Sequence, residues 1–200
     1  MTVTIYVEGG GNNNAETVRC KRGFTEYCKK LAPVGRLPRI VACGGRDQAF
    51  DRFATDVARN KPDNLCVLLV DSEGPVEPGT SPAVYLHARD RWVLPQMQLH
   101  RLFLMVQAME AWLLADRDRL AEYYGPNFRP NALRGDERHV EAIAKDDLEP
   151  CLIAASRDTT TKGRYNKGTH AFDLLATIDP AKVAASSPHA AEFHAFLRSL

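Results

Sequence analysis

One apolar run near the middle of the chain restricts the fold more than any other stretch. Residues 65–70 are six consecutive apolar residues, bounded by Asn64 and Asp71. A half-exposed strand would alternate apolar with polar residues and a helix would normally be longer, so the run predicts a strand buried on both faces. Asp71 and Glu73 follow at its carboxyl end. Because ligands bind at that edge of open parallel sheets, we expect the two acids to serve chemistry rather than packing.

A third acid follows another predicted strand. Residues 3–7 form a short β-rich run that leads through Glu8 into three glycines, a loop in which side chains cannot obstruct a ligand. If the two strands are neighbours, Glu8, Asp71 and Glu73 converge, and three close negative charges repel unless a proton or a cation lies between them. Mg²⁺, or Mn²⁺ in its place, takes such oxygen ligands. The alternative is that each acid only caps a turn or a helix.

The remaining pattern predicts an α/β fold with a mostly parallel sheet of about four strands flanked by helices. Strands and helices alternate through the first part of the chain, which is the order that right-handed crossovers between parallel strands produce. The predicted strands are residues 3–7, 38–43, 65–70 and 100–106. The predicted helices are residues 15–31, a helix capped by Asp47, and residues 109–124. A long loop over residues 74–95, regular only near its middle, lies beside the acids, and such loops are usually functional or mobile.

Beyond residue 125 the pattern is helical and basic, without further good strands. We therefore divide the chain into a core, residues 1–125, and a helical carboxyl-terminal extension packed on that core, residues 126–200. The predicted helices of the extension are residues 136–157, residues 169–176, and two more that begin at Asp179-Pro180 and at Ser187-Pro188. Pro150 must kink the first of these helices or start a second segment.

Two further side chains are candidates for the acidic edge. Glu110 comes just after the fourth predicted strand. It either points into the acidic group as another metal ligand or only opens its helix, where the helix dipole favours a negative charge. We expect Lys145 on a solvated helix face, with contact to the acids as the alternative. Trp112 and Phe103 are expected in the core.

The densest group of cations lies in a predicted loop, residues 159–168. Lys162, Arg164 and Lys167 stand there among Gly163, Tyr165 and Gly168. They either hold the phosphates of a nucleic acid or form a solvated basic loop. Tyr165 among them offers a stacking surface for a base. A loop that holds substrate should fold back over the acids.

Composition excludes several classes of function. The formal net charge of the 200 residues is +1, so no global attraction to nucleic acid or to an anionic membrane exists, and polyanion binding must come from local clusters.

The three glycines after Glu8 lack the third glycine of a dinucleotide-binding fingerprint, since Asn14 stands there, and no P-loop lysine follows. Five scattered cysteines predict reduced, mostly buried thiols, and with no leader or apolar span we expect a cytoplasmic protein.

The order of these motifs resembles a known module. Val7-Glu8-Gly9 after the first strand, Leu69-Val-Asp71-Ser-Glu73 after the third, and the alternation between them resemble the TOPRIM domain of topoisomerases, primases and nucleases of the overcoming-lysogenization-defect type. The TOPRIM part covers about residues 1–124. Over nearly the whole chain, the stretches at residues 105–116 and 165–168 look like the bacterial family called domain of unknown function 4276, itself considered TOPRIM-like.

The resemblance implies Mg²⁺-dependent phosphodiester chemistry. In it, the glutamate after the first strand, here Glu8, is a general acid/base or a metal ligand, and the acidic pair, here Asp71 and Glu73, holds the metal. This sequence departs from the usual Asp-x-Asp, because Glu73 is longer by one methylene. Members of the family are often encoded beside ABC-type ATPases, which implies such a partner and a role in phage defence.

Two hypotheses follow from the sequence. The first is a metal-dependent nuclease in which Glu8, Asp71 and Glu73 are catalytic, the same acids with Glu110 bind metal, and the loop cations place a DNA or RNA backbone. The second is a non-catalytic regulatory or partner subunit of an ATPase, in which the acids form a structural ion site. Fold alone does not separate the two, because one fold serves many functions.

Overall fold

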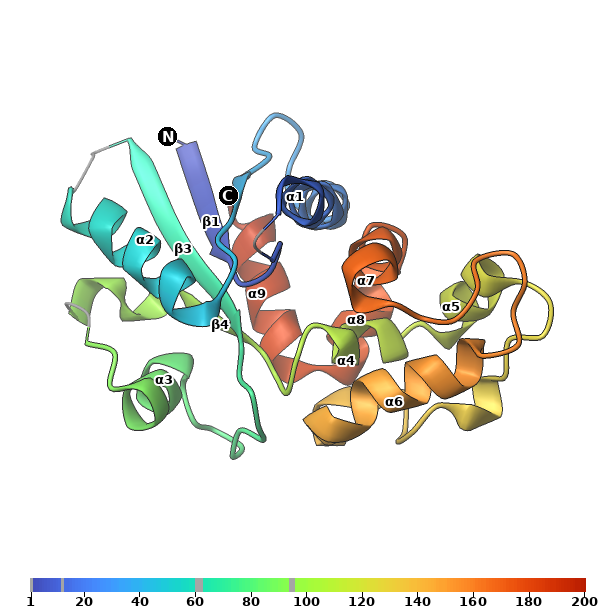
Figure 1. The fold of residues 1–200 in the computed structure, drawn as a ribbon. Helices are drawn as coiled ribbons and strands as arrows, with labels where there is room; N and C mark the ends of the chain where they lie inside the picture. The colour runs from blue at the N-terminus through green and yellow to red at the C-terminus, as the bar shows by residue number, and fades with distance from the viewer. Residues whose placement is uncertain (1, 12, 60–62, 94–95) are drawn as a thin grey trace.

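A parallel sheet of four strands organises the described part of the chain. The computed structural model describes residues 2–11, 13–59, 63–93 and 96–200 (Figure 1). The strands are β1 (Thr2–Val7), β2 (Arg39–Ala42), β3 (Asn64–Asp71) and β4 (Leu102–Met105). They are all parallel and lie in the order β2-β1-β3-β4. The predicted α/β class is confirmed, and its organisation is Rossmann-like.

The direction of winding reverses between β1 and β3. After β1 the chain forms β2 on one side of it and then returns to form β3 on the other side. Val7 pairs with Leu69, and the N–H of Glu8 donates to the Leu69 carbonyl at 3.2 Å, so Glu8 lies level with the end of β3. In open α/β sheets, the crevice at such a reversal is where ligands bind.

Helices cover both faces of the sheet. Leu69 packs in one core with Phe24 of α1 (Asn14–Lys29), and Leu68 packs in the other with Phe53 of α2 (Arg46–Ala58). α3 (Pro82–Asp90) adds to the second core through Leu86. Because successive residues of a strand point to opposite faces, β3 feeds both cores, and the strand buried on both faces is confirmed.

The other elements are helical and come mostly from the second half of the chain. The α-helices are α4 (Glu110–Leu114), α5 (Arg117–Tyr124), α6 (Lys145–Ser156), α7 (Lys167–Leu175), α8 (Pro180–Ser186) and α9 (Pro188–Arg198). Short 3₁₀ helices cover Gln96–Arg101, Pro130–Ala132 and Val140–Ala142. Residues 126–200 contain no strand, as expected.

The carboxyl-terminal helices pack on the sheet and on α1. Phe193 of α9 contacts Phe103 of β4 with ring centroids 5.3 Å apart. α7 lies beside α1 (Figure 1), where a Cβ added to Gly23 would meet the Phe172 carbonyl oxygen at 2.6 Å. The helices therefore share one hydrophobic core with the sheet. The division at residue 125 stays a prediction.

Several element boundaries differ from the prediction. The helix predicted over residues 109–124 is two helices, because Asp116 leaves helical geometry and caps α5 through the N–H of Arg119. α2 begins after Gly45, whose N–H donates to the Gln48 side chain, so Asp47 is in the first turn and is not the cap. The strand predicted from residue 100 begins at Leu102, after a 3₁₀ helix.

The helix predicted over residues 136–157 is also shorter. A 3₁₀ turn precedes α6. α6 continues past Pro150 to Ser156, so Pro150 does not start a second segment. The predicted starts at Asp179 and Ser187 are confirmed, since both side chains cap their helices. The loop over residues 74–95 contains α3, and its last two residues lie outside the described part of the chain.

The cysteines were expected to be reduced and mostly buried. All five are free and buried. No helix within the described ranges is both long and apolar enough to cross a membrane.

Candidate metal centre

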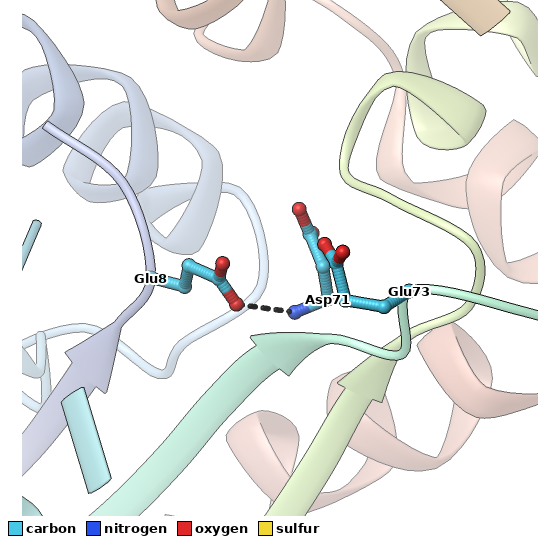
Figure 2. A group of neighbouring side chains, drawn as sticks. All are labelled: Glu8, Asp71 and Glu73. Atoms are coloured by element: carbon cyan, nitrogen blue, oxygen red, sulfur yellow. Dashed lines mark hydrogen bonds between the residues drawn. The ribbon is translucent and has the colours of Figure 1, made fainter. Parts of the chain in front are cut away.

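The three predicted acids meet at the carboxyl edge of the sheet. Glu8 follows β1, Asp71 ends β3 and Glu73 lies two residues further on (Figure 2). One carboxylate oxygen from each lies within 4.8 Å of the others. The expected convergence on adjacent strands is therefore confirmed. Figure 2 shows the Glu8 carboxylate reaching across from its own strand toward the backbone of Asp71.

Asp71 is the buried member of the group. Its Oδ1 accepts the N–H of Met109 at 2.8 Å, and its own N–H donates to Glu8 Oε2 at 3.3 Å. Burial, followed by the negative charges of Glu8 and Glu110, raises the pKa of Asp71 well above its usual value. The side chain thus caps the turn before α4 with one oxygen, which is part of the alternative role, and its ionised form is disfavoured by burial and by the neighbouring acids.

Glu8 is held by a cation that the sequence analysis did not identify. The Arg46 guanidinium, at the first position of α2, lies 3.6 Å from Glu8 Oε2 and donates to the Asp71 carbonyl. It also binds Asp90 at 2.6 Å and stacks over Trp92, 5.0 Å from the ring centroid. Burial raises the pKa of Glu8, the Arg46 charge opposes the rise, and the Glu73 charge adds to it.

Glu73 takes an unusual backbone conformation that keeps it at the edge. Its φ of 68° lies in the left-handed region, and its N–H donates to the carbonyl of Gln107 at 3.0 Å. The carboxylate forms an ion pair with Lys145 of α6. Lys145 was expected on a solvated face, but the Gln107 side chain accepts its N–H at 3.2 Å and fixes the start of α6 beside the acids.

Glu110 opens its helix, which was one of its two expected roles, and also contacts the basic loop. It is the first residue of α4, and its side chain is only 3% exposed. Lys167 lies 2.9 Å from its Oε1, and the Tyr165 hydroxyl donates to the same oxygen at 3.3 Å. Glu110 is near enough to Asp71 to raise its pKa but is not one of the three acids whose oxygens cluster within 4.8 Å.

The basic loop reaches the acidic edge through one residue. Burial disfavours the charged form of Lys167, but Glu110 and then Asp71 hold its pKa above the usual value. Lys162 instead lies over the Tyr123 ring, 5.0 Å from its centroid, and Arg164 is exposed. Within the described ranges, no ion pair joins either of these two cations to the acids. We expected all three cations of the loop to lie over the acids, and only Lys167 does.

Tyr165 corrects a sequence expectation. It was expected as a stacking surface for a base, but it is 97% buried and directed at Glu110. Ser156 Oγ accepts its N–H at 2.7 Å, which folds the loop inward at this point. A tyrosine between an arginine and an asparagine in a polar loop carries no sequence signal that separates burial from exposure, so only the packing could decide.

Arg46 and Asp90 are the residues that the sequence analysis missed. A signal for Arg46 existed, since it follows the two glycines that end the second strand, at the same edge as Glu8. Nothing in the sequence indicated that Asp90, at the end of α3, would bind it. Gly9 and Gly44 exchange two backbone hydrogen bonds, at 2.8 and 2.9 Å, which brings the loop after β2 against the loop after β1.

The donors present fit a hard divalent cation. Carboxylate oxygens are the ligands that Mg²⁺ and Mn²⁺ prefer, and Mg²⁺ is usually held by one or two carboxylates with water or phosphate. Asp71 forms no ion pair with any cation in the part of the chain that the structure describes, although its neighbours Glu8 and Glu73 do. Charge at this edge is therefore left for a bound cation to neutralise.

Fold and site together define a Rossmann-like α/β protein with an acidic group at the point where its sheet reverses direction. The family model described as Domain of unknown function (DUF4276) matches residues 7–198. The chain therefore belongs to that family, and the resemblance noted from its motifs is confirmed at this level. No curated protein and no solved structure gives a significant match.

Proposed function

We propose that this protein is a metal-dependent nuclease, a phosphodiester hydrolase that uses Mg²⁺ or Mn²⁺. The observation that carries the proposal is the meeting of Glu8, Asp71 and Glu73 where β1 and β3 end, with one oxygen of each within 4.8 Å. The proposed relation to TOPRIM domains rests on the same order of motifs. Three acids gathered at a ligand-binding edge favour a divalent cation over a purely structural role.

Asp71 and Glu73 would hold the cation. When bound, the ion would neutralise charge on the scissile phosphate and activate a water molecule. Burial raises the pKa of Glu8 above that of an ordinary glutamate, which suits a side chain that accepts and returns a proton. Lys167, which binds Glu110 and is about half exposed, is placed to contact a neighbouring phosphate.

The substrate and partner of the proposed nuclease are a nucleic acid, either DNA or RNA, and an ABC-type ATPase. The ATPase and the role in phage defence come from the resemblance, and cytoplasmic location from the sequence. The charge of +1 supports a substrate grip that is local to the edge and the loop.

The second candidate function is a regulatory subunit that acts by contact with an ATPase and keeps the acids as a structural ion site. One observation favours it. A cavity of about 360 Å³ lies beside α3, with a mostly apolar lining that includes Leu86, Trp92 and Leu102. Val84 and Val93 in the same lining are 61% and 74% exposed, and exposed apolar groups of this kind occur at protein contacts.

The test is an assay of the purified chain on single-stranded and double-stranded DNA and RNA with Mg²⁺, with Mn²⁺ and with chelator. We expect cleavage that requires the metal and disappears in Asp71→Asn. Asp118→Asn is the matched control, because that aspartate is 93% exposed and lies on α5, outside the acidic group. Metal-independent cleavage, or equal cleavage by Asp71→Asn, would reject the nuclease.

A further inference from the structure

The acidic edge carries its own cations, and they are distributed unevenly. Glu8 pairs with Arg46 at 3.6 Å, Glu73 pairs with Lys145, and Glu110 pairs with Lys167 at 2.9 Å. Among the residues that the structure describes, Asp71 joins no ion pair of its own, and Lys167, whose charge acts on it, is paired with Glu110. The charge that remains to be neutralised is therefore centred on one carboxylate.

Arg46 is fixed in its place and cannot readily leave Glu8. Its side chain is only 12% exposed. Asp90 accepts hydrogen bonds from Nε at 3.2 Å and from Nη2 at 2.6 Å, which is the two-point geometry that a guanidinium favours. Trp92 covers the guanidinium, and Phe50 stacks on Trp92 with ring centroids 4.3 Å apart. This support holds a positive charge beside Glu8 whether or not a metal is bound.

Lys145 is placed by the backbone at the start of α6. The Gln107 side chain accepts the N–H of Lys145 and donates to the Glu141 carbonyl at 3.3 Å, so one amide holds both sides of the turn before α6. Gln107 itself follows β4, and its N–H donates to Ser72 Oγ at 2.7 Å. These contacts of Gln107 fix the backbone of Lys145 within reach of Glu73, and the Lys145 ammonium forms an ion pair with the Glu73 carboxylate.

The size of the acidic group matches a single ion. Ligands on opposite sides of Mg²⁺ are roughly 4 Å apart, since each bond is about 2.0–2.1 Å, and the three acidic oxygens lie within 4.8 Å of one another. A two-metal site needs ions about 3.5–4 Å apart with acids on both outer sides. Here two of the three acids, Glu8 and Glu73, already face Arg46 and Lys145.

We propose that this edge binds one divalent ion, next to Asp71, and that Arg46 and Lys145 stand where a second ion would bind. This inference rests on the proposed function and adds the stoichiometry of its site. In the proposed nuclease, the two resident cations supply the additional positive charge that a two-metal enzyme takes from its second ion. Arg46 is a positioning residue for Glu8, and Lys145 is one for Glu73.

The experiment measures Mn²⁺ binding to the metal-free full chain by titration calorimetry and by electron paramagnetic resonance, which also detects coupling between two nearby Mn²⁺ ions. The wild type is expected to bind one ion at the edge. Lys145→Gln, and the double variant Arg46→Gln with Asp90→Asn, are expected to bind a second ion with a coupled spectrum. The double variant removes both members of the Arg46–Asp90 pair, so Asp90 is not left as an uncompensated buried charge, and Glu8 loses its cation and is open to the second ion.

Arg59→Gln is the control, because it removes an exposed arginine from the end of α2 and should leave one ion bound. Circular dichroism melts select the variants that fold, and Lys145→Gln, at a partly exposed side chain, keeps the test valid if the double variant does not. Two coupled ions in the wild type would overturn the single-ion inference, and one ion in every folded variant would overturn the assignment of Arg46 and Lys145 to the position of a second ion. Either result would leave the nuclease proposal standing. No bound ion in the wild type would overturn both.

Discussion

Two buried aspartates of this chain, Asp71 and Asp116, have opposite surroundings. Asp116 caps α5, accepts the N–H of Asp179 at 2.9 Å and binds Lys182 at 2.7 Å. Asp71 accepts one N–H and is acted on by the negative charges of Glu8 and Glu110, which the more weakly acting Lys167 opposes. Burial raises the pKa of both, but the hydrogen bonds and the lysine lower that of Asp116 overall, whereas the acidic neighbours raise that of Asp71 further.

The difference separates a structural acid from one retained for a ligand. Around Asp116, Lys182 and the N–H groups of Asp179 and Arg119 stabilise the ionised form, so the carboxylate contributes to folding. Around Asp71, ionisation is opposed in the metal-free protein, which is costly unless a cation binds. Residues that are strained in this way tend to lie at functional sites.

The largest expected effect is on cleavage. Asp71→Asn keeps an oxygen for the N–H of Met109 but removes the charge that holds the ion. We expect the metal-dependent rate to fall at least about 100-fold, since charge stabilisation by a metal is worth several kcal/mol. Asp116→Asn should retain most of the rate in the same assay at a temperature where it is folded. Equal losses in the two variants would remove the distinction between them.

The second effect is on stability and has the reverse order. Asp116→Ala should lower the free energy of unfolding by about 2–3 kcal/mol, through loss of a helix cap and of partners for buried donors. Asp71→Asn should leave it within about 1 kcal/mol of wild type, or raise it, in chelator. Urea denaturation measures both. Asp118→Ala also loses a contact to Lys182, but it is exposed, so it should cost less than about 0.5 kcal/mol.

The third effect is on the pH dependence of stability without metal. The pKa of Asp116 is lowered by folding, so its contribution is present above about pH 4 and is lost as the pH falls through the folded value. The pKa of Asp71 is raised, so its contribution is present below about pH 4 and is lost as the pH rises through the folded value. Thermal melts at a series of pH values above and below about pH 4 measure this. The stability of Asp71→Asn should change less with pH than that of wild type above this value, and the stability of Asp116→Ala should change less below it.

The smallest effect concerns the basic loop. Lys167→Ala should weaken nucleic-acid binding in chelator and reduce its salt dependence by about one unit of slope, because one phosphate contact releases about one counterion. Lys162→Ala is the comparison, since that ammonium lies over Tyr123 and away from the acids. Fluorescence anisotropy over a series of salt concentrations measures the slopes. A larger change for Lys162→Ala would place the nucleic acid on the Tyr123 side.

Periodicity and position in the sequence were enough to predict the sheet and the place of the acids. The run at residues 65–70 buries its apolar side chains when it forms a strand of a sheet that is covered on both faces. Parallel strands present their carboxyl ends at one edge of the sheet. The adjacency of Glu8 to Asp71 was expected only because acids at strand ends can share an ion when their strands are neighbours, and the strand order β2-β1-β3-β4 places them so. The break at Asp116 was not predictable in the same way, because apolar residues continue on both sides of it.

What the sequence by itself determined is the fold class and the three acids; what only the tertiary structure decided is their cation partners. Arg46, Lys145 and Lys167 reach the edge from α2, α6 and α7, and the last two come from far along the chain. Long flexible side chains give no periodic signal, and their ends are placed by contacts such as those of Gln107 and Asp90. Charge pairing across a fold depends on three-dimensional proximity, which local sequence patterns do not encode.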